Sequence, residues 1–371
     1  MSTIRYIILL LFIPILLDAQ VKLPSAGETY FFQVDKSPDK KTIPAKGNVK
    51  FWDYGFLQSP YIITYKSSTA PKDRSFLPSK TNLVLKSSND QILFYNVGRS
   101  IMGLTGYSIE DPFGIGYKAN VEFTNAFREN LAALKVGALT TEVAETYIEF
   151  GIDNIKDAFL KKLPLLPDSI RLNVLITRKN KVDGFGKIFL PDLTLTNCTR
   201  VTREETYDYT IDTKTGNYKW IDASDLFSQN IDELPHSKID ILFFNSKYVL
   251  PILKLATDNN GETVSKAEYF IPSKTALLKD KPAGQPDITL YPNPAYTKYI
   301  KLEINNIPTG RYTFKMYSLI GNLEKSIPYY INSAKFDTID ISDMKPGIYI
   351  YALVDGTGKI IQSKRLTIIS P

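Results

Sequence analysis

The segment "KFDTIDISDMKPGIYIYALVDGTGKIIQSKRLTII", residues 335–369, decides the fold of the C-terminal part of this chain. Its apolar residues alternate with polar ones in three runs, as they do in β-strands that bury one face. The dipeptide Pro346-Gly347 separates the first run from the second, and a glycine-containing turn separates the second from the third. We expect the first turn to need a positive φ at Gly347. The segment therefore predicts three strands joined by tight turns.

The residues before this segment continue the same pattern. Residues 301–304, Lys-Leu-Glu-Ile, predict a strand, and residues 312–323 alternate until a turn at Gly321-Asn322. About seven short strands that follow one another so closely are typical of a β-sandwich. We therefore expect a sandwich over residues 288–371, whose last strand contains Lys364, Arg365 and Leu366.

The motif Y-P-N-P, residues 291–294, stands near the start of this sandwich. Pro292 and Pro294 each fix a φ angle and lack an amide donor, so the motif cannot lie in the interior of a sheet. We expect it to form a stiff, extended lead into the first strand.

The order of these motifs resembles the type A C-terminal sorting domain of proteins exported by the type IX secretion system. The matching residues are Tyr291, Pro292, Asn293, Pro294, Tyr317, Gly321, Pro346, Gly347, Tyr349 and Lys364. The resemblance implies an Ig-like sandwich that the type IX machinery reads after the Sec translocon has moved the chain into the periplasm. It also implies an extracellular or outer-cell-surface location, with the sorting domain commonly removed on release or surface attachment.

The N-terminus predicts a signal peptide over residues 1–19. Arg5 precedes a 12-residue apolar run, residues 6–17, which suits a secretory signal and is shorter than the roughly 20 residues of a membrane-spanning helix. Ala19 is a suitable small residue for cleavage before Gln20. We expect no transmembrane segment in the mature chain; the alternative is an uncleaved membrane anchor.

A polar stretch with Lys, Pro and Gly, residues 273–287, predicts a linker between the sandwich and the rest of the chain. The passenger, residues 20–272, is rich in alternating segments and aromatic residues, and the whole chain has 23 tyrosines and 20 phenylalanines. This pattern predicts a β-rich fold, in one domain or two. The expected strands are residues 29–34, 61–65, 82–85, 92–97, 171–176, 185–190, 197–202, 207–211, 239–244, 252–255 and 267–271.

Residues 123–163 fit the strand pattern less well, because they are richer in Ala, Glu, Lys and Leu. One interpretation places short helices at residues 126–129 and 153–162. The other is a long hairpin over residues 121–136, interrupted at 128–130. Periodicity does not decide between them. The expected fold class is thus mainly β, with one or two short helices in the passenger.

The chain has one cysteine, Cys198, and one histidine, His236. An intramolecular disulfide and a zinc site with several Cys and His ligands are therefore excluded. We expect Cys198 to be a buried strand residue and His236 to lie in an exposed loop, without a catalytic role. The formal charge of +6 is spread over 45 basic and 39 acidic residues, which does not favour nucleic acid as a partner. No cofactor or metal is expected and no catalytic site is identified; a non-enzymatic role is favoured, and an enzymatic one stays open.

Three passenger stretches resemble an uncharacterised group of passengers that carry the same sorting domain. The first contains Gly47, Trp52, Asp53 and Tyr54; the second contains Val182, Asp183, Gly184, Phe185, Gly186 and Pro191; the third contains Pro251. This resemblance implies no function.

The aromatic and acidic residues of these stretches raise three functional hypotheses. Trp52 and Trp220 are candidates for rings that stack on a sugar, although core packing is the simpler expectation for Trp in a β-fold. Asp53 and Asp183 are candidates for a pair of hydrolase carboxylates, which would have to lie roughly 5–9.5 Å apart. The leading hypothesis is a secreted binding or structural module; the alternatives are a carbohydrate-active hydrolase and an adhesin that binds a surface glycan or polysaccharide.

Overall fold

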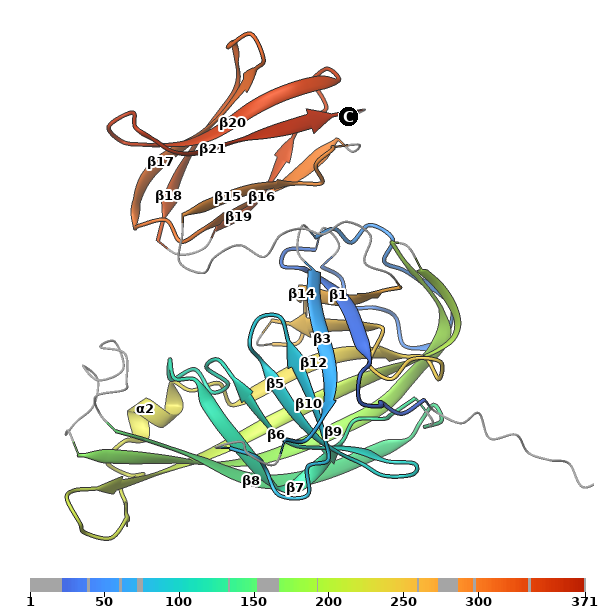
Figure 1. Ribbon diagram of the computed structural model, residues 1–371, viewed down its shortest axis with the longest axis vertical. Coiled ribbons are helices and arrows are strands. Elements are labelled where there is room, and N and C mark those ends of the chain that lie inside the picture. Colours follow the sequence, from blue (N-terminus) through green and yellow to red (C-terminus); the bar gives the residue numbers. More distant parts are fainter. Residues whose placement is uncertain are drawn as a thin grey trace, which may run out of the picture.

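The computed structural model describes residues 22–38, 41–59, 62–71, 76–132, 134–151, 167–191, 193–258, 260–272, 286–295, 298–332 and 335–369. The expected signal peptide, the helix expected at 153–162 and residues 273–285 of the expected linker lie outside these ranges. The described chain is mainly β, as the sequence predicts (Figure 1).

The described part of the passenger forms one sheet of 14 strands with the order β2-β9-β10-β12-β13-β14-β1-β3-β4-β5-β6-β7, to which β8 adds beside β9 and β11 beside β10. The strands are β1 (Thr29–Asp35), β2 (Gly47–Asp53), β3 (Ile62–Thr69), β4 (Leu83–Ser87), β5 (Ile92–Val97), β6 (Met102–Ile109), β7 (Ala119–Arg128), β8 (Leu139–Gly151), β9 (Ser169–Leu190), β10 (Leu193–Lys214), β11 (Ile221–Asp222), β12 (Ser237–Phe244), β13 (Leu253–Thr257) and β14 (Val264–Ile271).

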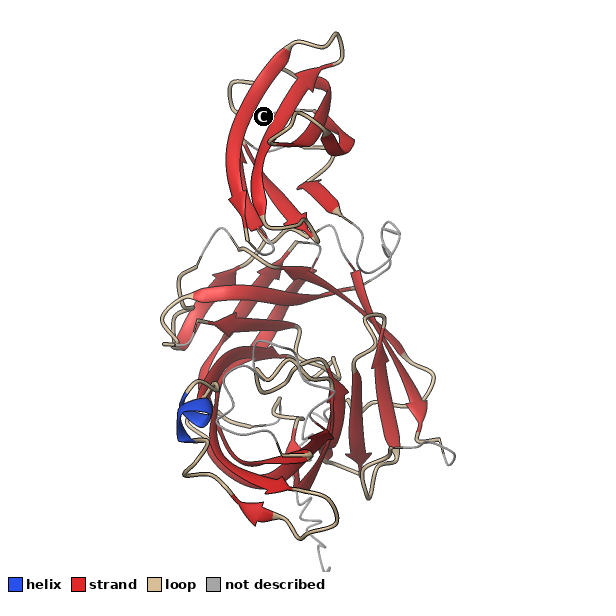
Figure 2. Ribbon diagram, turned by 90° about the vertical axis from the view of Figure 1, so that its left-hand side faces the viewer, coloured by secondary structure: helices blue, strands red, loops and turns tan. Residues whose placement is uncertain are grey.

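This sheet curls round until β7 lies beside β8 (Figure 2). Side chains bridge the seam between the two strands. The backbone N–H of Glu145 donates to Thr124 Oγ1 over 2.8 Å, and Asn125 Nδ2 donates to the carbonyl of Val143 over 3.2 Å. The concave inner face encloses an apolar core to which Phe32, Leu85, Phe127, Val174 and Ile211, among others, contribute.

β9 and β10 are each 22 residues long, whereas the sequence predicts two shorter strands in place of each. Between the two strands predicted for β9, residues 177–181 are all polar. In the structure Arg178 and Asn180 point inward and are 6% and 0% exposed. A strand can continue through such residues because the polar groups that face them from other strands satisfy their charge and hydrogen bonds.

The inward-facing charges form a network inside the ring. Arg178 Nη1 lies 2.6 Å from Glu129 Oε1, Arg178 Nε donates to Glu205 Oε1 over 2.7 Å, and Arg203 Nη2 lies 2.9 Å from Glu129 Oε2. Tyr207 donates its hydroxyl to Glu205 over 2.7 Å. Burial alone would raise the pKa of Glu205, but the charge of Arg178, with Lys238 and Arg203, outweighs it and lowers this pKa to about 2.

Neither interpretation describes residues 121–136 correctly. β7 continues to Arg128, so the helix expected at residues 126–129 is absent. The hairpin expected over residues 121–136 also needs correction, because the next strand, β8, starts at Leu139 and pairs with β9. A short helix that the sequence did not predict, α2 (Ser228–Asp232), lies before β12.

The C-terminal region is a two-sheet sandwich, as predicted. One sheet has the order β15-β16-β19 and the other has the order β18-β17-β20-β21. Their inner faces enclose a core that includes Ile288, Ile300, Phe314, Tyr351 and Leu366. The strands are β15 (Asp287–Tyr291), β16 (Tyr299–Asn305), β17 (Gly310–Ser318), β18 (Leu323–Ile331), β19 (Lys335–Asp340), β20 (Gly347–Asp355) and β21 (Ile360–Ile368).

Two expectations about the turns of this sandwich need correction. The Y-P-N-P motif does not lead into the first strand, because β15 already ends at Tyr291 and the prolines follow it. Gly347 does not have a positive φ; it is the first residue of β20. A φ of +89° is found instead at Gly321, in the turn between β17 and β18, and at Gly358, in the turn between β20 and β21.

Among the helices of the described residues, none has the length and apolar character needed to cross a membrane.

Candidate ligand-binding site

A hollow of about 800 Å³ lies against β7, β8, β9 and β10, a volume in the range of small-molecule sites. We call it the groove. Phe76 and Ser79, from the segment before β4, line it as well, and the amide of Ser79 donates to Glu122 Oε1 over 2.8 Å. Its lining residues are Phe76, Ser79, Asn120, Glu122, Phe123, Thr124, Glu145, Thr146, Tyr147, Asn173, Val174, Leu175, Asp208 and Thr210.

Strand alternation explains the chemistry of the groove. Along β7 the residues Asn120, Glu122 and Thr124 are exposed, whereas Val121 and Phe123 between them are buried. The same rule exposes polar side chains on the neighbouring strands, because successive residues of a strand point to opposite faces. The lining therefore carries carboxylates, amides and hydroxyls, and it contains no Lys or Arg among the described residues.

Thr146 lies between Glu145 and Tyr147 on β8, so its side chain points away from the groove, toward the core that Ala144 and Ile148 enter. It is 6% exposed, and its Oγ1 makes no hydrogen bond within the described part of the chain.

A stack of three side chains adjoins the groove. The guanidinium of Arg171 lies 5.1 Å from the ring centroid of Tyr147 and 4.3 Å from that of Trp220. Arg171 Nε donates to Glu149 over 2.9 Å, which fixes the guanidinium between the two rings. Tyr147 is 56% exposed and Trp220 is half-buried. Arg171 thus contacts both Trp220 and Tyr147, of which Tyr147 lines the groove, and Lys214 Nζ lies 5.9 Å from the centroid of the Trp220 ring.

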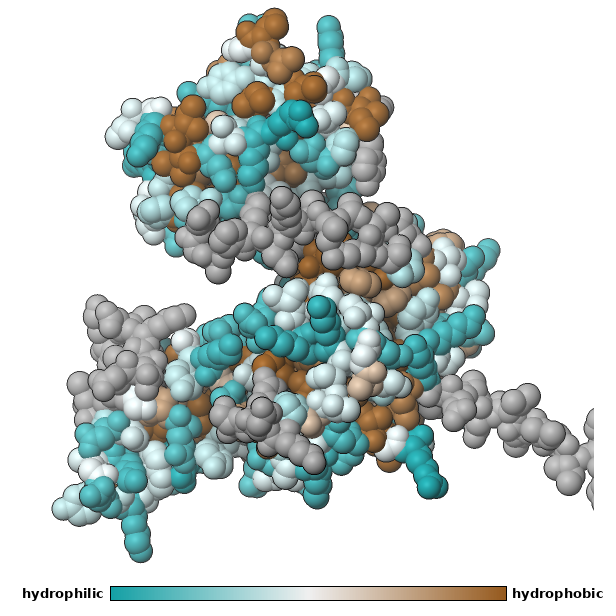
Figure 3. Space-filling view, in the orientation of Figure 1, coloured by the Kyte–Doolittle hydropathy of each residue, from teal (hydrophilic) through white to brown (hydrophobic). Residues whose placement is uncertain are grey.

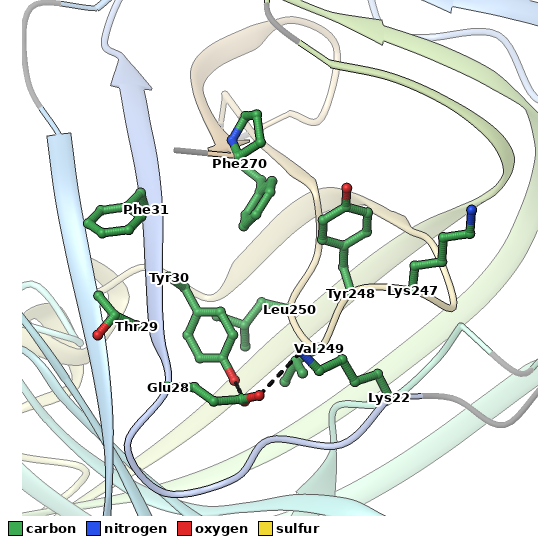
Figure 4. Close-up of a pocket in the computed structure, with 11 residues that line it drawn as sticks. Lys22, Glu28, Thr29, Tyr30, Phe31, Lys247, Tyr248, Val249, Leu250 and Phe270 are labelled. Carbon is green, nitrogen blue, oxygen red and sulfur yellow. Dashed lines mark hydrogen bonds and ion pairs between the residues drawn. The ribbon is translucent and has the colours of Figure 1, made fainter. Parts of the chain in front are cut away.

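A second hollow, of about 320 Å³, lies where the N-terminal residues meet the β12–β13 connection (Figure 4). Glu28 accepts a short hydrogen bond from the hydroxyl of Tyr30 and an ion pair from Lys22 at 3.2 Å. Burial and the neighbouring Glu28 raise the pKa of Tyr30. On another wall Tyr248 packs edge-on against Phe270, 4.8 Å between ring centroids. Lys22 and Glu28 thus pair with each other, and the hollow is smaller than the groove, which makes it the weaker candidate.

The structure places Trp52, the other aromatic candidate, in the core. Trp52 is 4% exposed, its ring packs edge-on against Phe243, and its Nε1 donates to the carbonyl of Ala45 over 2.9 Å. β2 and β9 pair in parallel, and Gly47 lies opposite Gly184. The passenger motifs therefore meet at one packing unit, whose role is structural.

Asp53 and Asp183 are not brought together. In the β2–β9 register Asp53 lies opposite Phe189, six residues along β9 from Asp183. At about 3.3 Å per residue this separates them by roughly 20 Å, well beyond the distance that a pair of hydrolase carboxylates needs. Asp53 is exposed, whereas Asp183 is buried and forms an ion pair with Arg200.

Arg200 is fully buried, with 0% of its side chain exposed. Its Nη1 contacts Asp183 and donates to Thr202 Oγ1 over 3.0 Å, while its Nε and Nη2 make no hydrogen bond within the described residues. Its aliphatic stem packs beside the ring of Trp52 at Gly184. The group is a structural ion pair beneath the β2–β9 packing unit.

Cys198 and His236 have the burial that we expect from the sequence. Cys198 is a buried residue of β10, and burial raises its pKa to about 11, which makes its thiol a poor nucleophile. His236 is exposed between α2 and β12, with Nδ1 3.4 Å from the carbonyl of Tyr207. The described residues contain no group of three or more His, Cys, Asp or Glu side chains placed to hold a metal ion.

Sequence reasoning identified Trp220 but missed the rest of the site. The available signal was the alternation of residues 139–151, which places Tyr147 on the exposed face of a strand, beside Glu145. Arg171 and Asp208 belong to strands that the sequence predicted in part, yet nothing in the sequence shows that β7, β8, β9 and β10 lie next to one another.

In the sorting region, the Y-P-N-P motif joins the two sheets of the sandwich. Asn293 Nδ2 donates to the carbonyl of Arg365 over 2.7 Å, and Asn293 Oδ1 accepts the amide of Thr367 over 3.0 Å. Lys364 Nζ lies 2.6 Å from Asp287 Oδ1 on β15. These bonds tie the start of the region to its closing strand.

The other motif residues have structural positions. Tyr291 and Tyr349 are buried at 4% and 8% exposure, and the hydroxyl of Tyr349 donates to the carbonyl of Lys345 over 2.8 Å. Tyr317 is half-buried on β17, at a bulge opposite Leu323 of β18. Pro346 lies in the bend just before β20.

Comparison with known proteins identifies a family for the C-terminal region. Residues 289–368 match the family described as "Secretion system C-terminal sorting domain". No curated protein matches the chain. A solved structure described as "Novel fungal alcohol oxidase with catalytic diversity among the AA5 family, in complex with copper" aligns with 93% of this chain and 100% of its own at 8% identity, but its TM-score of 0.17 does not indicate a shared fold. The match to the family and the order of the motifs together show that this chain carries a type IX secretion system C-terminal sorting domain, which marks it for export out of the cell, behind a β-rich passenger.

Proposed function

We propose that the chain enters the periplasm through the Sec translocon, loses residues 1–19 between Ala19 and Gln20, and then leaves the cell through the type IX machinery. The sorting domain at residues 289–368 and the apolar N-terminal run support this route. The passenger then acts outside the cell or on its outer surface.

We further propose that the passenger is a glycan-binding module and that the groove is its binding site. The observation that carries this proposal is the stack of Tyr147, Arg171 and Trp220 beside a polar hollow of about 800 Å³. Sugars present C–H faces that pack on aromatic rings and hydroxyls that pair with carboxylates and amides. The groove and the stack offer both kinds of contact in one place.

The charges of the groove select the class of glycan. Glu122, Glu145 and Asp208 line it, and no basic residue does so among the described residues. Uronic acid polymers would place like charges against these carboxylates, which is unfavourable. Neutral glycans avoid this like-charge repulsion, because their hydroxyls donate hydrogen bonds to the carboxylates. We therefore assign neutral glycans to the groove.

An array that carries neutral and uronic-acid glycans tests this proposal. The full-length chain is expected to bind neutral members, and Trp220→Ala or Tyr147→Ala to weaken binding about tenfold or more, as for central aromatic contacts. Tyr330→Ala is the matched control, because Tyr330 is an aromatic residue of the sorting domain with 64% exposure. Absence of binding to any neutral glycan, or equal binding by Trp220→Ala and the control, contradicts the proposal.

A further inference from the structure

The outer face of β16 in the sorting domain is covered by the passenger. Ile300, Leu302 and Ile304 point into the sandwich core, so strand alternation turns Lys301 and Glu303 outward, where they would normally be solvated. Their side chains are instead only 5% and 1% exposed.

The passenger residues that cover this face carry complementary charges. Lys301 Nζ lies 2.8 Å from Asp35 Oδ2, and Glu303 forms an ion pair with Lys36. β1 ends at Asp35, and Lys36 follows it. The two ion pairs therefore join the end of β1 in the passenger to β16 in the sorting domain (Figure 1). Lys36 also lies over the ring of Phe336 on β19, 5.6 Å from its centroid.

In the passenger, backbone hydrogen bonds fix the carboxylate of Asp35 in place. Asp35 is 0% exposed. Its Oδ1 accepts the amide of Ser37 over 3.1 Å, and its Oδ2 accepts the amide of Gln58 over 3.0 Å. Two backbone donors thus fix the carboxylate where Lys301 reaches it. A buried carboxylate held in this way requires a cation, because an unpaired buried charge is strongly unfavourable.

The contact is specific but incompletely satisfied. Glu303 Oε1 accepts from Asn305 Nδ2 over 2.7 Å, whereas Glu303 Oε2 is buried and makes no hydrogen bond within the described residues. An unsatisfied buried oxygen reduces the stability of a contact. The docked arrangement is therefore one that can separate.

We propose that the sorting domain is a noncovalent ligand of its own passenger: the Asp35–Lys301 and Lys36–Glu303 pairs hold the two parts together even after the chain between them is cut. The partner of the β16–β19 outer face is thus the end of β1 in the same chain. In the docked form this face of the sorting domain is covered, and separation exposes Lys301, Glu303 and Phe336 together.

The proposal is tested on the full-length chain with a site-specific protease sequence in place of residues 276–282. After cutting, the dissociation constant of the two fragments is measured by sedimentation. We expect the wild-type fragments to remain associated at micromolar concentration, and Lys301→Met to weaken association on the order of 100-fold, because Asp35 is then left buried without a cation. Far-UV circular dichroism checks that each variant is folded, and Glu303→Gln is the second variant.

Two further variants sharpen the test. Lys325→Met is the matched control, since Lys325 pairs with the exposed Asp343 of the sorting domain itself, 2.9 Å away. It should leave association unchanged. Asp35→Asn combined with Lys301→Met should recover part of the lost affinity, because neither charge is left alone, although the Asn amide accepts only one of the two backbone N–H groups that Asp35 accepts. Separation of the wild-type fragments on cutting, or equal release by the single and the double variant, overturns the proposal.

Discussion

The indole of Trp52 lies against the backbone of Gly186, where an added Cβ atom would come within 3.0 Å of the indole Cζ3 and 2.3 Å of the carbonyl oxygen of Val49. The parallel pairing of β2 with β9 thus depends on the absence of a side chain at this position. The glycine at residue 186 and the tryptophan at residue 52 thus have a packing explanation.

Gly186→Ala is therefore expected to destabilise the passenger by about 2–3 kcal/mol, since the backbone of β2 must move to admit the methyl group. Chemical denaturation followed by circular dichroism measures this change. Gly98→Ala is the control, because its Cβ would meet no atom closer than 3.9 Å; a control that loses as much stability as Gly186→Ala would refute the packing explanation.

The ion network inside the ring gives the stability a defined pH dependence. Glu205 has a pKa of about 2 in the folded state, below its ordinary 4.5. Its contribution is fully present above pH 4.5 and is lost as the pH falls towards 2, because the unfolded chain binds the proton first. We expect the free energy of unfolding to fall by a few kcal/mol over this window from this group.

Glu205→Gln separates this effect from general acid sensitivity. The variant should be less stable at pH 7 by about 3–5 kcal/mol, because Arg178 loses one of its two carboxylates, and its stability should change less between pH 4.5 and 2.5. Urea unfolding at several pH values measures both quantities. An unchanged pH profile in the variant would show that Glu205 is not the titrating group.

In the sorting domain, Asn293 is expected to matter through its two hydrogen bonds to β21. Asn293→Ala should destabilise the sandwich by about 1–3 kcal/mol, since it removes one donor and one acceptor, and should reduce the amount of chain delivered outside a type IX-competent cell. Ser326→Ala, at an exposed position of β18, is the control. Thermal unfolding and immunoblots of cell fractions provide the readouts, and an equal loss in the control would argue against a specific role.

The C-terminal sandwich could be predicted from the sequence as a fold, because its short strands alternate and its turns carry Gly and Pro, whereas the place of the Y-P-N-P motif and the backbone of Gly347 could not. The passenger was harder for a physical reason. Arg178, Asn180 and Glu205 are polar yet point into the ring, so a strand that continues through them looks interrupted. Burial of such residues depends on partners from distant strands, such as Glu129, which alternation within one segment does not reveal.

The same limit explains the candidate site. Trp220 is a candidate from the sequence because the chain has only two tryptophans. That Tyr147 and Arg171 lie near it does not follow from the sequence. Arg171 of β9 brings Tyr147 of β8 next to Trp220, which precedes β11. Trp52, in contrast, was best read as a core residue, and its 4% exposure agrees with that reading.

Acrylamide quenching of tryptophan fluorescence tests the binding claim most directly, because Trp52 is buried and Trp220 is the accessible ring. We expect neutral cellohexaose or chitohexaose to protect the fluorescence of the full-length chain from the quencher in a saturable manner, and a hexamer of galacturonic acid to give no protection. Quenching that neutral oligosaccharides leave unchanged, or that the acidic hexamer reduces equally, would contradict a neutral glycan in the groove.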